Sequence, residues 1–242
     1  MSGLICIAGG KGAPGATTLA IALARASVAS FDADRAVTLI DADPDGGDMA
    51  SRLGVTSTPG LVTLAAATRH GFDPRDLLAH TQLVAPNLQL VASPSSAEQA
   101  SSSLGKLGRP FASMVATSDA VADVGRWRLR SPAADLIAEA DVTILVIHPT
   151  VSGVAHARYQ LDDLLNACRR VEVVCAGDRP YAPDEVSSAL GVESVYALPV
   201  DRRSAELVGK TAATDRWLRR STLVRSVAAL RLTTSRDEMV AS

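Results

Sequence analysis

The chain has 242 residues, a formal net charge of −2, 47% hydrophobic residues and only 3% aromatic residues. This length suits one α/β domain with a substantial core of mostly alanine, valine and leucine. The near-zero net charge gives no global electrostatic case for nucleic-acid binding. We expect a single folded domain over residues 1–232 and a polar C-terminal tail over residues 233–242.

A glycine-rich loop over residues 9–18 joins a predicted buried strand to a helix that begins near Gly15. Glycines let backbone N–H groups approach an anion and adopt positive φ, and a helix N-terminus adds favourable partial charge. We interpret the segment as a phosphate-binding loop. The standard loop has a lysine before the hydroxyl residue, but here that position is Ala16 and the loop's only lysine is Lys11. The alternative is a strand-to-helix turn that binds nothing.

Two carboxylates follow the next apolar run, residues 36–40. Asp41 and Asp43 would lie at the C-terminal end of a buried parallel strand, which is where open α/β sheets bind ligands. A carboxylate near magnesium and a γ-phosphate can position water for phosphoryl transfer. The alternative is an acidic, solvated turn that opens a short helix at Asp48.

A third acidic segment covers residues 119–125, where a short strand ends near Asp123. It is followed by residues 126–130, Arg-Trp-Arg-Leu-Arg, which we call the basic run. Such a run is often only a solvated face. The functional alternatives are that one of its arginines replaces charge lost at Ala16, or that the run binds a partner.

The remaining chain alternates between strand-like and helix-like segments, which predicts a mostly parallel, twisted sheet with helices on both faces. Ser152 is a candidate N-cap, and Gly105 and Gly108 are expected to break a helix. A final helix before residue 232 should dock on the sheet; the alternative is a helix on a membrane surface. Further strands are predicted over residues 88–92, 142–147, 171–175 and 195–198. Further helices are predicted over residues 59–67 and 73–80, from the serine-rich turn after residue 92 to residue 116, and from the Ser152 cap to residue 168.

Three cysteines lie in or beside apolar segments without Cys-x-x-Cys spacing: Cys6, Cys168 and Cys175. We interpret them as small core residues in a reducing compartment, which argues against an iron–sulfur site with exposed thiolates. No basic region precedes the short N-terminal apolar run, and no apolar run reaches the length that spans a bilayer. We therefore expect no signal peptide, no transmembrane segment and a cytoplasmic location.

The glycine loop, Asp-x-Asp at 41–43 and Asp-x-Gly at 123–125 together resemble the MinD/ParA family of dimerising ATPases. These are SIMIBI-class P-loop NTPases with a deviant Walker A loop, and the resemblance implies a single-domain α/β P-loop fold that binds ATP and Mg²⁺. It implies that Lys11 reaches the partner's ATP across a homodimer and that Asp43 orients the attacking water. The magnesium residues it implies are Thr17, Asp41 and Asp123. The implied nucleotide-contacting residues of the loop are Gly10, Lys11, Gly12, Ala13, Pro14, Gly15, Ala16, Thr17 and Thr18.

A late segment extends the resemblance to nearly the whole chain. Residues 195–201 resemble the family's strand-Pro-x-Asp element, which implies that Pro199 and Asp201 lie near the adenine. Residues 175–178 occupy the place where relatives often carry a base-contacting asparagine. That asparagine is absent here, and Asp178 is the candidate substitute.

The function implied by the resemblance is an ATP-binding, dimerising switch that positions a protein partner or cargo, with weak or partner-dependent hydrolysis. Settings in the family are partition, division-site choice and polar placement of a pilus or secretion machine, and the altered loop resembles pilus-associated members. Whether the chain is an ATPase stays open because of Ala16. The alternatives are a non-hydrolysing scaffold and a DNA-associated partition protein. Only local arginines support DNA binding: Arg202, Arg203, Arg219 and Arg220.

Overall fold

The computed structural model describes residues 3–12, 15–30, 35–68, 74–210, 217 and 220–230. Its strands form one eight-stranded sheet. They are β1 (Leu4–Gly9), β2 (Val37–Asp41), β3 (Gln82–Ala85), β4 (Leu88–Val91), β5 (Ala120–Arg126), β6 (Val142–Ile147), β7 (Val171–Ala176) and β8 (Val195–Leu198). The strand order is β3-β4-β2-β5-β1-β6-β7-β8, and every pairing is parallel except the β3–β4 hairpin. The predicted fold class, a single α/β domain with a mostly parallel sheet, is confirmed.

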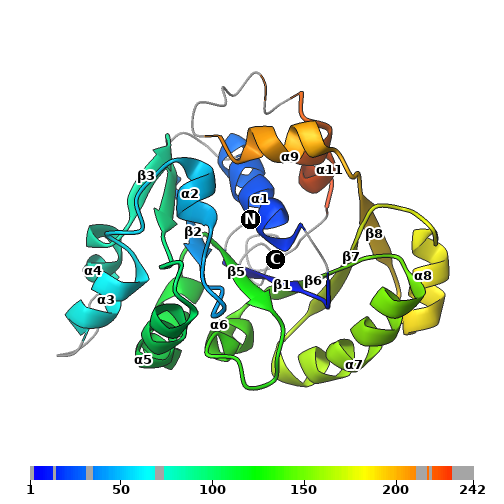
Figure 1. Cartoon of the computed structure of the whole chain (residues 1–242), viewed down its shortest axis with the longest axis horizontal. Helices are drawn as coiled ribbons and strands as arrows, with labels where there is room; N and C mark the ends of the chain where they lie inside the picture. The colour runs from blue at the N-terminus through cyan, green and yellow to red at the C-terminus, as the bar shows by residue number, and fades with distance from the viewer. Residues whose placement is uncertain are drawn as a thin grey trace, which may run out of the picture.

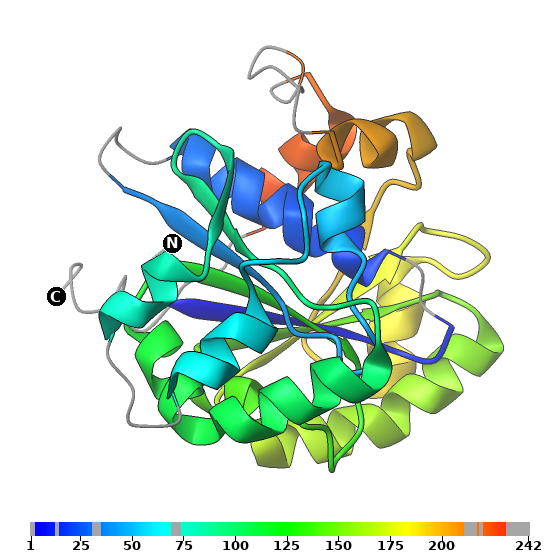
Figure 2. The ribbon, with the colours of Figure 1, turned by 60° about the vertical axis from the view of Figure 1, so that its left-hand side comes forward.

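Helices cover both faces of the sheet (Figure 1). They are α1 (Ala16–Ser30), α2 (Met49–Leu53), α3 (Leu61–Ala67), α4 (Pro74–Ala79), α5 (Ala97–Ala116), α6 (Ala134–Glu139), α7 (Val151–Ala167), α8 (Pro183–Leu190), α9 (Arg202–Val208) and α11 (Thr222–Ala228). Figure 2 shows α1 on one side of the sheet and α5 and α7 on the other. The described helices α1, α2, α9 and α11 contribute to one hydrophobic cluster, and α3 to α8 contribute to the other.

The central strand β1 explains why the sheet needs both layers. All six of its residues are buried, and successive side chains point to opposite faces of a strand. Leu4 and Cys6 pack in the cluster on the α5 side, whereas Ile5 and Ile7 pack in the cluster on the α1 side. A strand that is apolar on both faces is typical of a parallel sheet buried between helices.

Two predicted helix boundaries are wrong in detail. Helix α7 is capped by the Thr150 hydroxyl, which accepts a hydrogen bond from Gly153 N at 3.1 Å, and not by Ser152. Thr150 has the extended backbone that an N-cap requires, while Ser152 already lies within the helix. Gly108 does interrupt α5 (φ 48°, ψ −149°), but the helix runs through Gly105.

The final described helix docks on α1 and not mainly on the sheet. Its buried residues Leu223, Val224 and Val227 join the α1-side cluster. Short elements that the sequence analysis did not predict are β3, α6, α8 and α9. Most of the basic stretch before α11, including Arg219, and the predicted tail over 233–242 lie outside the described residues.

Candidate functional site

A cleft of about 490 Å³ opens at the C-terminal ends of β1, β2 and β5, where the glycine loop meets the two acidic segments. We call it the P-loop cleft. Its lining residues are Gly9, Gly10, Gly12, Gly15, Ala16, Thr17, Asp43, Asp45, Arg52, Asp123, Gly125 and Arg126. Segments that are far apart in the sequence therefore meet where parallel sheets bind ligands.

The glycine loop is anchored at its base and open at its sides. Gly10 N donates to Val146 O at 2.8 Å, which ties the loop to β6. Gly12 and Gly15 have φ of +66° and +117°, and a Cβ on either would meet no atom within 4 Å. The backbone thus leaves space above the N-terminus of α1, as a phosphate cradle requires. Ala13 and Pro14, two of the predicted contact residues, lie outside the described residues.

Ala16 and Lys11 have different surroundings. Ala16 is 8% exposed and packs in the α1-side core while it also lines the cleft. Lys11 is exposed and is not among the lining residues. The cations among the described lining residues are two arginines. Arg52 is bound to Asp48 at 2.7 Å, whereas Arg126 forms no ion pair within the described part of the chain.

Asp41 and Asp123 lie side by side beneath the cleft, because they are partners in the β2–β5 register. Both are 1% exposed. Burial, followed by the neighbouring charge of Asp123, raises the pKa of Asp41 to about 7. Burial also raises the pKa of Asp123 to about 6, against the opposing effect of hydrogen bonds from the Thr17 hydroxyl and Gly125 N. Two carboxylates held together without a cation are the kind of pair that a bound cation stabilises.

The donor set at this point fits magnesium. It consists of carboxylate oxygens and the Thr17 hydroxyl, and Mg²⁺ takes oxygen ligands and retains several waters beside phosphates. Within the described ranges, no group of three or more His, Cys, Asp or Glu side chains is arranged to hold a metal. Residues that could hold a magnesium ion at this point are Thr17, Asp41 and Asp123.

Asp43 is held at the wall of the cleft by two neighbours. Its Oδ1 accepts a hydrogen bond from Asp45 N at 2.8 Å, and a Cβ on Gly125 would overlap its carboxylate. Gly125 has φ +65°, so this position favours glycine for two separate reasons. Burial raises the pKa of Asp43. Arg128 of the basic run binds Asp45 through two hydrogen bonds, at 3.0 and 2.7 Å.

A second pocket of about 260 Å³ adjoins the cleft at the ends of β6, β7 and β8, and both are lined by Gly15. Thr18, Pro199 and Asp201 line this adjoining pocket. Asp201 also caps α9, since its carboxylate accepts hydrogen bonds from Ser204 N and Ser204 Oγ at 3.0 and 2.6 Å. Asp178 is exposed and does not line the pocket.

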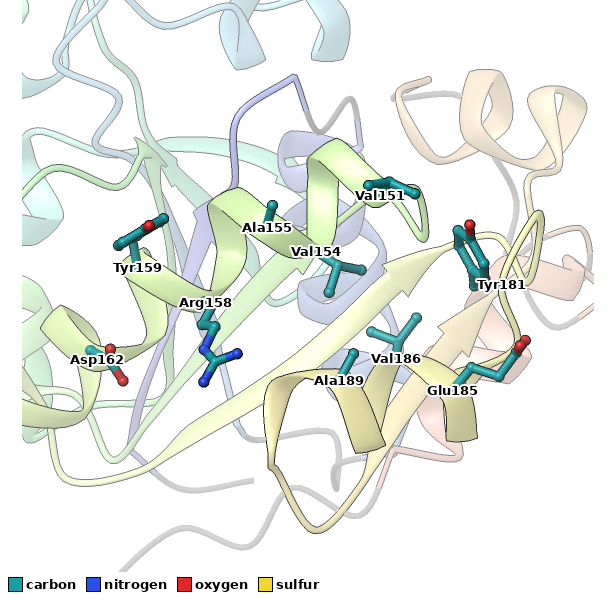
Figure 3. A pocket seen from close by; sticks show the side chains of 10 residues that line it. All are labelled: Val151, Val154, Ala155, Arg158, Tyr159, Asp162, Tyr181, Glu185, Val186 and Ala189. Carbon is teal, nitrogen blue, oxygen red and sulfur yellow. The ribbon is translucent and has the colours of Figure 1, made fainter.

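A larger hollow than the P-loop cleft lies between α7 and α8, with a volume of about 660 Å³. Figure 3 shows Val154 and Arg158 pointing from α7 toward Val186 and Ala189 on α8. Its described lining is mostly apolar and includes no residue of the glycine loop or of the acidic segments. Size alone would favour this hollow, but the glycine loop and the two acidic segments meet at the P-loop cleft.

The comparisons with solved structures agree with this geometry. A ParA family ATPase from Chlorobium tepidum aligns with a TM-score of 0.76 over 93% of this chain and 96% of that chain, at 19% identity. MinD from Pyrococcus horikoshii, complexed with Mg-ADP, aligns with a TM-score of 0.66 over 94% of this chain and 95% of that chain, at 18% identity. A plasmid partition protein from Borrelia burgdorferi gives 0.61 over 93% and 96%, at 15% identity. The chain has the ParA/MinD fold.

These likenesses are likenesses of structure. No family model and no curated protein sequence matches the chain. On the ParA/MinD fold, the described loop residues lie at the end of β1, and Asp41 and Asp123 lie at the ends of the strands beside it. No helix in the described ranges has the length and apolarity needed to cross a membrane.

Sequence reasoning did not find every residue that lines the cleft of this ParA/MinD fold. Arg52 lies in the last turn of α2 and Asp45 follows the Asp-x-Asp pair, and neither was predicted as a site residue. A signal for Asp45 was present, because it is a third alternating carboxylate after Asp41 and Asp43. Arg52 carried no such signal, since it reaches the cleft only through the placement of α2.

Proposed function

We propose that the chain binds ATP with Mg²⁺ in the P-loop cleft and acts as a dimerising switch that positions a protein partner or cargo. One observation carries the proposal: an open glycine loop at the start of α1 lies beside the buried Asp41–Asp123 pair and the Thr17 hydroxyl. Two proteins of similar structure give independent support. They are MinD with Mg-ADP and a McdA variant from Cyanothece with ATP.

The described residues divide the work of binding. The backbone of Gly10, Gly12 and Gly15 lines the space for phosphates. Thr17 would ligate the magnesium ion, and Asp41 and Asp123 would hold its waters. When bound, the ion supplies positive charge against phosphate oxygens.

Asp43 is the proposed catalytic carboxylate. It lies at the cleft wall with one oxygen bound to the Asp45 amide, so its other oxygen is available to accept a hydrogen bond from water. Its distance in sequence from the loop and its placement in the cleft both favour this role. Pro199 and Asp201 in the adjoining pocket are the proposed base-side residues.

Ala16 makes weak binding and slow or partner-dependent hydrolysis the expected behaviour. Its methyl group packs in the core and offers no charge to phosphate. Arg126, which lines the same cleft without an ion pair among the described residues, supplies part of the missing charge. The same observation on Ala16 favours the second candidate function, a nucleotide-binding scaffold that does not hydrolyse ATP.

Lys11 supports the dimeric form of the proposal. It is exposed at the loop, and it is absent from the lining of its own cleft, as expected of a side chain that reaches a second copy. The proposed partner or cargo is one that is positioned in partition, in division-site choice or in the polar placement of a pilus or secretion machine. A MinC:MinD complex from Aquifex aeolicus is among the similar structures.

Sedimentation with and without Mg-ATP tests the switch. We expect the parent to shift from monomer to dimer with Mg-ATP, and Lys11→Ala to remain monomeric while its far-UV spectrum and unfolding midpoint stay unchanged. Lys106→Ala is the matched control, because it removes a lysine on α5, away from the cleft. A parent that stays monomeric at saturating Mg-ATP contradicts the dimerising switch.

A further inference from the structure

Gln160 is a polar residue on the inner side of α7. The residues around it on that helix, Ala157, Leu161 and Leu164, are buried and apolar. Gln160 itself is half-buried. An amide placed beside such a stripe costs stability unless it forms hydrogen bonds, so its contacts indicate why it lies there.

Those contacts reach two parts of the P-loop cleft. Gln160 Nε2 donates to Trp127 O at 3.3 Å. A Cβ on Gly10 would lie 3.3 Å from Gln160 Oε1, so the same amide also lies against the glycine loop. Trp127 N in turn donates to Gly9 O at 3.1 Å. One side chain on α7 therefore joins the loop to the start of the basic run.

Two buried atoms at this point have no hydrogen-bond partner within the described part of the chain, the Trp127 indole Nε1 and Gln160 Oε1. Buried polar atoms without a hydrogen-bond partner are costly, so each one in a native structure calls for an explanation. Trp127 is 4% exposed and packs in the α5-side core, while its neighbour Arg126 lines the cleft. The position of Trp127 therefore fixes the point from which Arg126 reaches the cleft.

We propose that Gln160 is a positioning residue for the basic run: it holds Trp127 against the glycine loop and thereby directs Arg126 into the P-loop cleft. The role of Arg126 toward phosphate rests on the proposed function, but the placement of Trp127 by Gln160 does not. The two parts can be tested separately.

The first test uses no nucleotide. Gln160→Met keeps the length of the side chain and its helix propensity but removes the donor and the acceptor. We expect backbone amides over residues 126–130 to exchange about three- to tenfold faster than in the parent, the effect of one lost hydrogen bond on local opening. In a Trp217→Phe background, Trp127 becomes the only tryptophan, and acrylamide should quench its emission more strongly in Gln160→Met.

The control is Asp162→Asn, on the exposed side of the same helix. It should leave exchange over 126–130 and quenching of Trp127 as in the parent. Because Gln160→Met also removes an orphaned buried oxygen, its global unfolding midpoint should not fall. The proposal is overturned if amide exchange over 126–130 and quenching of Trp127 are the same in Gln160→Met as in Asp162→Asn. It is also overturned if the only effect of Gln160→Met is a lower global unfolding midpoint.

The second test is a double-mutant cycle on Mg-ATP affinity with Gln160→Met and Arg126→Ala. If Gln160 acts through Arg126, each single variant binds more weakly, and the double variant binds no more weakly than Arg126→Ala alone. Losses that add overturn the link to Arg126. Absence of ATP binding in the parent overturns the proposed function, and the exchange comparison then still decides whether Gln160 positions Trp127.

Discussion

Asp41 and Asp123 are register partners on adjacent parallel strands, and both carboxylates are buried at the base of the cleft. Asp41 accepts a hydrogen bond from Met49 N at 3.0 Å, and Asp123 accepts one from Gly125 N at 3.0 Å. Neither forms an ion pair within the described residues. The protein thus keeps two buried carboxylates, which are costly to ionise together, at the place where a cation bound with phosphate would stabilise their charge.

This pair predicts a pH dependence of stability. The folded-state pKa of Asp41 is raised to about 7 from 3.8, so the folded state holds the proton more tightly than the unfolded state. The contribution of Asp41 to stability is then fully present below pH 4 and is lost as the pH rises through 7. Asp41→Asn should remove this loss. From pH 5 to pH 8, its free energy of unfolding should fall by about 2–4 kcal/mol less than that of the parent.

Urea unfolding of both proteins at pH 5 and pH 8 measures the difference. The control is Asp45→Asn, an exposed carboxylate in the same cleft, whose profile should follow the parent's. Parallel pH profiles for the parent and Asp41→Asn contradict the assignment of a buried, proton-holding carboxylate at this position.

Gly125→Ala should be costly because it combines two effects. A residue with a side chain at φ +65° carries backbone strain of about 1–2 kcal/mol, and its Cβ would also overlap the Asp43 carboxylate. Gly191→Ala is the matched control, since Gly191 has φ +71° at the end of α8 and no atom within 4 Å of an added Cβ. Thermal unfolding should show a larger loss for Gly125→Ala, and an equal loss in both variants would show that Asp43 does not press against this position.

The ion pair between Arg128 and Asp45 should contribute little to stability. Both side chains are about half exposed, and such pairs are worth at most about 1 kcal/mol. The free energy of unfolding of Arg128→Ala should therefore be close to that of the parent. Raising the salt concentration should not change the difference between the two proteins. A loss well above this value in denaturant titrations would indicate that the pair holds the basic run and the Asp45 loop together.

The sequence predicted the parts of the site that depend on local order. The strand, glycine loop and helix over residues 4–29 are adjacent in the chain, and alternating carboxylates after an apolar run mark a strand end. The relation between Arg128 and Asp45 could not be predicted, because it joins positions 83 residues apart. Gln160 gave no signal either, since its importance comes from the packing of α7 against the loop.

Local choices between similar residues also lay beyond the sequence. Thr150 and Ser152 are both capping residues by type, and only the extended backbone at Thr150 decides between them. Gly105 and Gly108 look alike in sequence. The chain turns at Gly108, two residues before Pro110, while Gly105 stays within the helix at a modest cost in propensity.

Turnover should be slow in the isolated protein. A missing electrostatic contact to developing charge commonly costs about two to three decades in rate, and Ala16 leaves such a contact unmade. We expect the residual Mg-ATP hydrolysis to be abolished in Asp43→Ala and reduced in Arg126→Ala. Phosphate release by the parent, by both variants and by Arg130→Ala as a control measures this, and brisk turnover that survives Asp43→Ala would rule out its catalytic role.

Calorimetric titration of ATP into the parent and Ala16→Lys, each with and without Mg²⁺, tests the central claim most directly. The parent should bind weakly and only with Mg²⁺. Restoring the lysine should tighten binding by about one to two decades, the value of one charge-assisted hydrogen bond. Absence of magnesium-dependent binding in both proteins would contradict the account, and equal affinity in both would show that the missing lysine does not limit binding.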